Sequence, residues 1–161
     1  IGLLGQQPLL FPHLDVLSNV AYGPRAQKLR RDEARALALE MLERLDAADL
    51  ASRRPGELSG GQAARVALAR ALATRPRAML IDEPFAAVDV EYTPRLRVAV
   101  KAALAEVGCP SIIVTHDPAD VAALADDVAV LENGRIVEHG PAAEIMARPE
   151  SSFGKLLFTQ K

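Results

Sequence analysis

The sequence predicts an α/β fold, a mostly parallel sheet with flanking helices. Short apolar segments that are typical of buried strands occur at Ile1–Leu4, Ala78–Ile81 and Ser111–Thr115, with helical stretches between them. The second of these strands ends directly on two adjacent carboxylates, Asp82 and Glu83. In an open α/β sheet the carboxyl ends of the strands are where ligands and metal ions bind.

Helical patterns fill the remaining stretches. Apolar residues recur there on one face, and acidic residues, glycine or proline mark the ends. The first helix is expected to end at Gly23-Pro24, since proline disrupts a helix. The expected helices are Asp15–Tyr22, Asp32–Leu45, about 60–74, Pro94–Val107, one that starts at Pro118, and one from Gly140-Pro141 through about Ala147.

A hairpin is expected near the end of the sequence. Asp127–Glu132 and Arg135–His139 alternate between apolar and polar residues, and the Asn133-Gly134 pair between them is the strongest short hairpin signal. The tail to Lys161 is expected to be short and peripheral. No linker rich in glycine and serine interrupts the chain, so we expect one continuous domain.

The amino-acid composition limits the classes of protein to which this chain can belong. Half of the 161 residues are apolar and a quarter are charged, as in ordinary globular domains. The net charge of −2 argues against a general nucleic-acid binder, which is usually basic. No apolar run approaches the roughly twenty residues that a membrane-spanning helix needs. The single cysteine, Cys109, excludes an internal disulfide, and the spacing of the three histidines does not suit a metal cage.

The segment LSGGQ, residues 58–62, indicates a tight loop that opens a helix. Ser59 is a natural N-cap, and two glycines behind it leave the first backbone N–H groups uncovered, which makes an anion site. The pattern Ser59-x-x-Gln62 is also a capping box, which stabilises a helix start and needs no ligand. Likewise, Asp82-Glu83-Pro84 taken alone is compatible with an ordinary strand that ends in a turn and has no functional role.

In combination, these motifs resemble the nucleotide-binding subunit of an ABC transporter. LSGGQ is similar to the signature of that family, and AMLIDEP is similar to its Walker B strand with the catalytic glutamate. The resemblance implies a partial P-loop NTPase domain in which Asp82 holds Mg²⁺ and Glu83 polarises the attacking water. The ATP-contacting residues that it implies are Ser59, Gly60, Gly61 and Gln62.

Three further segments extend the resemblance. Gln6, five residues before Phe11 in the LFPH segment, is implied to be the catalytic and magnesium-binding glutamine of the Q-loop, with Gln7 as the alternative. FAAVD resembles the D-loop and places Asp89 at a dimer interface beside ATP, with Ala86 in place of the usual serine. His116 resembles the catalytic H-loop histidine that reaches the γ-phosphate. Each of these residues alone would more often serve a turn or a helix cap.

The resemblance covers essentially the whole chain, 1–161, but matches only the part of the family domain from the Q-loop strand onward. Residues 15–57 would form its helical subdomain, and 58–148 would hold the signature, Walker B, D-loop and H-loop. A P-loop, G-x-x-x-x-G-K-[ST], is missing, because Gly154-Lys155 is followed by leucine. We expect a truncated form that hydrolyses little or no ATP alone and exposes apolar surface.

The implied function is that of an ATP-binding and ATP-hydrolysing importer subunit. Two such subunits would sandwich two ATP molecules and drive a transmembrane permease. The implied location is cytoplasmic and peripheral, on the inner face of the cell membrane, with no direct membrane span and no nucleic acid. NVAYGPR is similar to importers of oxyanions such as molybdate. The alternatives are a non-transport ABC ATPase that acts on DNA and a catalytically inactive interaction fragment, and the lack of a long coiled-coil pattern favours transport.

Overall fold

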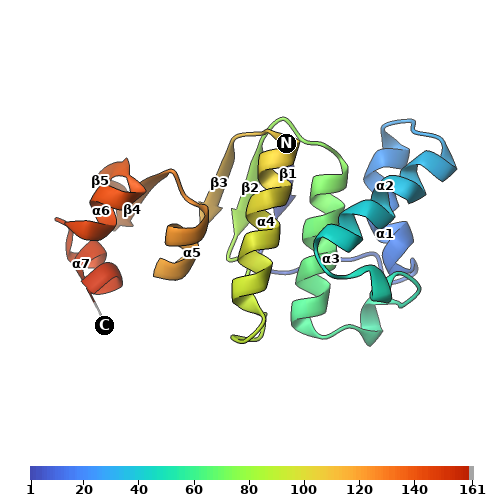
Figure 1. The fold of residues 1–161 in the computed structure, drawn as a ribbon, viewed down its shortest axis with the longest axis horizontal. Helices are drawn as coiled ribbons and strands as arrows, with labels where there is room; N and C mark the ends of the chain where they lie inside the picture. Colours follow the sequence, from blue (N-terminus) through green and yellow to red (C-terminus); the bar gives the residue numbers. More distant parts are fainter. Residues whose placement is uncertain (160–161) are drawn as a thin grey trace. The chain divides into compact units, whose positions relative to one another are not determined.

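The computed structural model describes residues 1–159. They divide into two compact units, Ile1–Val114 and the part that begins at Thr115. Figure 1 shows the helices and strands of both units. Among residues 1–159, no helix is both long and apolar enough to cross a membrane.

A three-stranded, all-parallel sheet lies in the first unit, in the order β1-β2-β3. Ile81 is aligned with Leu4 of one neighbour and Asp82 with Val114 of the other, so the three carboxyl ends share one edge. This sheet, with its flanking helices, confirms the α/β prediction. The strands are β1 (Gly2–Leu4), β2 (Met79–Asp82) and β3 (Ser111–Val114).

The two faces of this sheet differ in exposure. Met79 and Ile81 are buried on one face, at 0% and 2% exposed. On the opposite face Leu3, Leu80 and Ile112 form a row in register and are 70%, 39% and 65% exposed. Parallel sheets are ordinarily covered on both faces. Within residues 1–159 this second face is therefore an open apolar surface.

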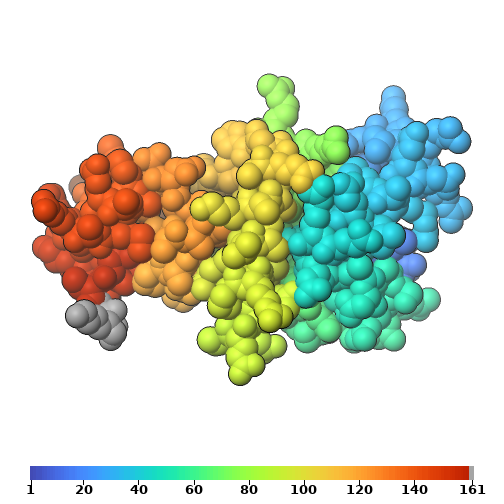
Figure 2. All heavy atoms as spheres, viewed as in Figure 1, coloured from blue at the N-terminus to red at the C-terminus, as the bar shows by residue number. Residues whose placement is uncertain are grey.

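Three helices that pack on one another make up most of the first unit's core. Their fully buried side chains include Leu42, Leu68 and Leu72, whose burial stabilises by roughly 1.5–3 kcal/mol each. A fourth helix is joined to the second by the ion pair between Arg44 and Glu106. Figure 2 shows the yellow atoms of this fourth helix beside the cyan atoms that follow the second. The helices are α1 (Val16–Ala26), α2 (Arg31–Arg44), α3 (Gly60–Ala73) and α4 (Thr93–Val107), with short 3₁₀ turns at Ala48–Leu50 and Pro55–Glu57.

The expected end of the first helix at Gly23-Pro24 is wrong, because α1 continues through Pro24 to Ala26. Proline disfavours a helical residue before it chiefly by clashing with the backbone N–H and Cβ of that residue. Gly23 has no Cβ, which relieves part of this clash, and a Cβ there would instead collide with Thr74. The helix therefore passes through the proline and ends one turn later than the sequence predicts.

The second unit contains an antiparallel pair of strands between short helices. Asn133 and Gly134 join the strands with φ values of 49° and 75°, which confirms the hairpin prediction. The last helix of this unit occupies most of the tail and is absent from the sequence prediction, while residues 160–161 of that tail lie outside the described residues. The elements are α5 (Pro118–Leu124), β4 (Asp127–Glu132), β5 (Arg135–Pro141), α6 (Ala142–Ala147) and α7 (Ser152–Thr159).

A carboxylate from β5 holds the start of α7. Glu138 accepts hydrogen bonds from the backbone N–H of Glu150 at 2.9 Å, and from the backbone N–H and the hydroxyl of Ser151 at 3.0 and 2.6 Å. The Ser151 hydroxyl, followed by the two N–H groups, lowers the pKa of Glu138 below its usual 4.5. The Ser151 hydroxyl in turn accepts from the Gly154 N–H at 3.0 Å, so a local serine cap opens α7 and Glu138 holds that serine in place from β5.

Glu138→Ala is expected to lower the melting temperature at pH 7. Because the folded state lowers the pKa of Glu138, its ionised form stabilises the fold above the unfolded pKa, and this contribution is lost as the pH falls through the folded value. The difference between variant and wild type should therefore shrink below about pH 4. Thermal unfolding from pH 3 to 7 measures this, with Glu144→Ala on α6 as the control. A difference that is constant with pH would contradict the cap.

Candidate functional site

Two carboxylates lie at the carboxyl end of the central strand. Asp82 is the last residue of β2, and Glu83 follows it with its N–H donating to Val114 O at 2.9 Å. Glu83 has a φ of 49°, in the left-handed region that non-glycine residues rarely adopt. Such backbone strain costs about 1–3 kcal/mol and clusters at functional sites. The sequence predicts the carboxylates, whereas only the structure reveals this strained backbone.

Gln6 and Gln7 lie at the same edge of the sheet as these carboxylates. Both are exposed and follow β1, the parallel neighbour of β2, after a single intervening glycine. The carboxylate of Asp82 and the amide oxygen of Gln6 are the hard oxygen ligands that Mg²⁺ prefers. No cluster of three or more His, Cys, Asp or Glu side chains occurs in residues 1–159. A magnesium ion at this edge fits if phosphate and water supply most of its six ligands.

The signature segment opens α3 as a capping box. The Ser59 hydroxyl accepts from the Gln62 N–H at 3.2 Å, and the Gln62 side chain accepts from the Ser59 N–H at 3.0 Å. This confirms the capping-box prediction. The box uses neither the N–H of Gly60 nor that of Gly61, and these first-turn groups have no partner within the helix. The cap therefore leaves both amides available to an anion, to which the helix dipole adds attraction.

The two glycines of this segment pack closely on the segment that contains Asp89. A Cβ added to Gly61 would lie 3.1 Å from Ala87 O and 3.2 Å from Val88 Cα, and one on Gly60 would lie 3.3 Å from Ala87 Cβ. Sequence reasoning assigned these glycines only to uncovering N–H groups. Their second role, close packing, depends on a chain segment more than twenty residues away.

Gly61→Ala is expected to destabilise the first unit by about 1–3 kcal/mol, because the new Cβ meets backbone atoms that cannot rotate away. Urea unfolding of the variant measures the change. Gly56→Ala is the matched control, since a Cβ at Gly56 has no atom within 4 Å. Equal stability of the two variants would show that residues 87–88 can shift away from the new Cβ without loss of folding free energy.

Asp89 lies at the start of α4. Its carbonyl oxygen accepts hydrogen bonds from the N–H groups of Tyr92 and Thr93, both at 3.0 Å, and from the Thr93 hydroxyl at 2.9 Å. These bonds attach the residue to the first turn of the helix and leave its exposed side chain outside the turn.

His116 lies in the second unit, just after β3. The Thr115 hydroxyl donates to the buried Asp120 carboxylate at 2.6 Å and accepts from the Asp117 N–H at 3.1 Å. Asp117 caps α5 by accepting from the Ala119 N–H at 2.8 Å. These bonds hold the backbone on both sides of His116. Gln6, Asp82 and Glu83 thus lie at one edge of the sheet in the first unit. His116 belongs to the second unit.

A buried amide organises the LFPH segment, and sequence reasoning missed it. Asn19 is fully buried; its Oδ1 accepts from the Phe11 N–H at 2.8 Å, and its Nδ2 lies within hydrogen-bond distance of three carbonyl oxygens. These carbonyls belong to Phe11, Leu14 and Asp15, at 3.1, 3.2 and 3.0 Å. The available signal is a polar residue on the apolar face of a predicted helix.

Arg70 of α3 holds the two residues that come just before this segment. Its guanidinium donates to the carbonyl oxygens of Pro8 and Leu9 at 3.0 and 2.9 Å and lies 5.4 Å from the Phe11 ring centroid. Burial lowers the pKa of the Arg70 guanidinium from its ordinary value. Leu9 itself is 74% exposed, so the chain here presents an apolar side chain on a well-held backbone.

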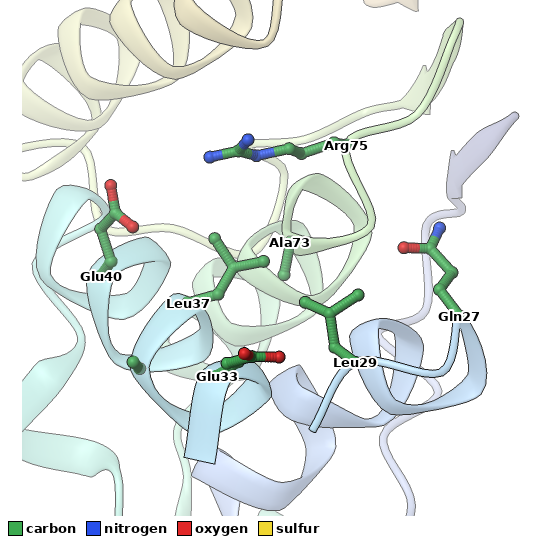
Figure 3. Close-up of a pocket in the computed structure, with 8 residues that line it drawn as sticks. Gln27, Leu29, Glu33, Leu37, Glu40, Ala73 and Arg75 are labelled. Atoms are coloured by element: carbon green, nitrogen blue, oxygen red, sulfur yellow. The ribbon is translucent and has the colours of Figure 1, made fainter. Parts of the chain in front are cut away.

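A pocket of about 480 Å³ lies apart from these features (Figure 3). Leu29, Leu37 and Ala73 form its apolar part, and Glu40 and Arg75 lie on opposite sides of it. None of the predicted site residues lines this pocket. The predicted site residues lie instead at a sheet edge and at a helix start.

Comparison with known proteins finds a match over the segments that contain these motifs. A family model described as ABC transporter matches residues 1–86, more than half of the chain. The chain belongs to the ABC transporter family. The matched residues include Gln6, the LSGGQ segment, Asp82 and Glu83, all on the first unit.

Curated ABC transporter relatives match nearly all of the chain. The molybdenum import ATP-binding protein ModC of Mycobacterium tuberculosis is 47% identical, over 96% of this chain and 43% of that protein. The Fe(3+) ions import ATP-binding protein FbpC of Pseudomonas fluorescens is 46% identical, over 94% and 42%. The spermidine/putrescine import ATP-binding protein PotA of Acidothermus cellulolyticus is 42% identical, over 95% and 40%. The chain thus spans less than half the length of these relatives.

Solved ABC transporter structures share the fold. A bacterial ABC transporter cassette, solved as a dimer, aligns with a TM-score of 0.78 and 33% identity, over 88% of this chain and 62% of that one. A post-hydrolysis state of an ATP-binding cassette, bound to ADP and phosphate, aligns with the same TM-score and 32% identity, over 88% and 62%. The roles of individual site residues in this ABC transporter chain stay predictions.

Proposed function

We propose that this chain is part of the ATP-binding and ATP-hydrolysing subunit of an ABC importer. The observation that supports this most directly is the strained Glu83 beside Asp82, at the sheet edge that also bears Gln6. The names of the relatives, which are import ATP-binding proteins, point in the same direction.

The sheet edge would perform the chemistry. ATP, when bound with Mg²⁺, supplies the phosphoanhydride bond whose hydrolysis releases free energy. Asp82 and Gln6 would hold the magnesium ion through their oxygens. Glu83 would orient the attacking water and accept its proton, a role worth about 10²- to 10⁴-fold in rate. His116 would donate a hydrogen bond to the terminal phosphate.

The start of α3 would bind the phosphates of a nucleotide held by a second subunit. The N–H groups of Gly60 and Gly61, at the positive end of the helix, would face the developing negative charge. Ser59 and Gln62 would add side-chain hydrogen bonds while they keep the loop in shape through the capping box. Asp89 would lie at the interface between the two subunits. A solved relative that is dimeric supports this arrangement.

The other partner would be a transmembrane permease, which would place the subunit on the cytoplasmic face of the cell membrane. The stretch from Pro8 through the LFPH segment suits a docking role because Asn19 and Arg70 hold its backbone at two points while Leu9 remains exposed. A preformed segment loses little conformational entropy on binding.

For the transported solute we propose an oxyanion such as molybdate. The support is the 47% identity to a molybdenum import protein, together with the NVAYGPR segment. Relatives whose names give Fe(3+) and spermidine or putrescine are 46% and 42% identical, which makes the solute the part of the proposal most in need of a test.

The test is ATP-driven uptake by the full-length protein reconstituted with its permease in vesicles. Wild type is expected to take up labelled molybdate when ATP is inside, and Glu83→Gln is expected to stop uptake. Uptake of sulfate in place of molybdate would keep the oxyanion class and change the ion. Uptake of Fe(3+) or spermidine would correct the solute class and keep the importer. Undetectable ATP hydrolysis by the wild type would refute the proposed function.

A further inference from the structure

Three side chains from three elements meet beside the start of α3. The Tyr92 hydroxyl donates to a carboxylate oxygen of Asp46 at 2.5 Å. Nη1 of Arg65 donates to the Tyr92 hydroxyl oxygen at 3.0 Å and to the backbone carbonyl of Asp46, and its guanidinium lies 4.5 Å from the Tyr92 ring centroid. Asp46 follows α2, Arg65 belongs to α3, and Tyr92 is the N-cap residue of α4.

The three members of this cluster differ in exposure. The Arg65 side chain is 14% exposed, whereas that of Asp46 is 79% exposed. Burial, followed by the hydrogen bond to Asp46, raises the pKa of Tyr92 above 10, so that its hydroxyl keeps its proton at neutral pH. Tyr92 therefore donates to Asp46 and accepts from Arg65 at the same time.

The position of this cluster on α3 relates it to the signature glycines. Gly61 and Arg65 are four residues apart and so lie on the same face of the helix. Gly61 packs on Ala87 and Val88, and the N–H of Tyr92 donates to Asp89 O. One face of α3 thus contacts the segment 87–92 at two points, a close backbone approach at one end and the Arg65–Tyr92 contact at the other.

We propose that Asp46, Arg65 and Tyr92 form a clamp that sets the position of the signature glycines against the segment 87–89. The clamp residues are positioning residues, because they contact one another and act through the N–H groups of Gly60 and Gly61. Tyr92 links both features, since its side chain contacts α3 and its backbone is bonded to Asp89. The expected effect of the clamp on ATP hydrolysis rests on the proposed function. Its expected effect on the position of the signature glycines rests on the contacts alone.

The structural test is amide hydrogen exchange of the full-length protein. Tyr92→Phe keeps the ring over Arg65 and removes only the hydroxyl. Exchange of the hydrogen-bonded amides of Ser59, Gln62 and Ala63 is expected to become about tenfold faster, because the loss of a hydrogen bond to charged groups favours local opening. Glu91→Gln, an exposed neighbour, is the control and should leave this exchange unchanged. Unchanged exchange in Tyr92→Phe would overturn the clamp whether or not the protein hydrolyses ATP.

The catalytic test is the ATPase activity of the permease complex. Tyr92→Phe is expected to lower kcat about tenfold with less than a twofold change in KM for Mg-ATP, at temperatures below its melting point. Asp46→Ala combined with Tyr92→Phe should cost little more than either substitution alone, because both break the same hydrogen bond between Tyr92 and Asp46. Unchanged kcat in an active wild-type background would overturn the clamp. Wild-type inactivity would refute the proposed function, while the exchange result would still decide the clamp.

Discussion

Glu83→Gln is expected to lower the kcat for ATP hydrolysis of the full-length protein by a factor of about 10²–10⁴, the usual contribution of a general base. Glutamine has nearly the same shape as glutamate but cannot take a proton from water at neutral pH. The left-handed backbone at Glu83 and its N–H bond to Val114 O do not involve the side chain, so the fold should tolerate the change. Steady-state phosphate release measures kcat.

Binding and turnover should separate in this variant. Glu83→Gln is expected to retain ATP, which a filter-binding assay with labelled nucleotide detects, because the residues that would contact the nucleotide are unaltered. Glu43→Gln, on an exposed position of α2, is the matched control and should hydrolyse ATP like the wild type. Turnover within twofold of the wild type would show that Glu83 is not the base.

Asn19→Ala is expected to reduce the free energy of unfolding by about 2–4 kcal/mol. The substitution leaves the Phe11 N–H without its acceptor and removes the amide that faces three carbonyl oxygens of half-buried residues. An unsatisfied buried polar group costs about 1–3 kcal/mol, and the small cavity adds to this. Urea unfolding followed by circular dichroism measures the change.

Gln27→Ala is the matched control, since it also removes a side-chain amide. The Gln27 amide donates to Thr74 O at 2.9 Å on the exposed surface, where water replaces the lost bond. Its effect should stay within about 0.5 kcal/mol. A loss below 1 kcal/mol for Asn19→Ala would mean that water reaches the LFPH segment and satisfies its backbone.

Several local features were predictable because neighbouring residues determine them. The capping box at Ser59 and Gln62 needs only a four-residue pattern. The Asn133-Gly134 hairpin follows from the positive φ values that asparagine and glycine tolerate. The carboxylates after β2 were found because an apolar strand followed by charge is visible in the sequence alone.

The error at α1 and the omission of α7 have different causes. Helix α1 passes through Pro24, where Gly23 relieves part of the steric clash, a competition that proline alone does not reveal. Helix α7 opens with a local cap at Ser151, which the sequence prediction overlooked and which Glu138 of β5 holds in place. The first outcome depends on a balance of contacts, whereas the second has a local signal that a tertiary contact reinforces.

The sequence by itself determined the fold class, the family motifs and the residue types available for phosphate chemistry, because these depend on periodicity and on short spacings. Only the tertiary structure decided how those residues are held. The strain at Glu83, the packing of Gly61 on Val88 and the contact between Arg65 and Tyr92 depend on how separate segments meet. Such contacts arise from close packing in three dimensions, which a linear pattern does not encode at any one position.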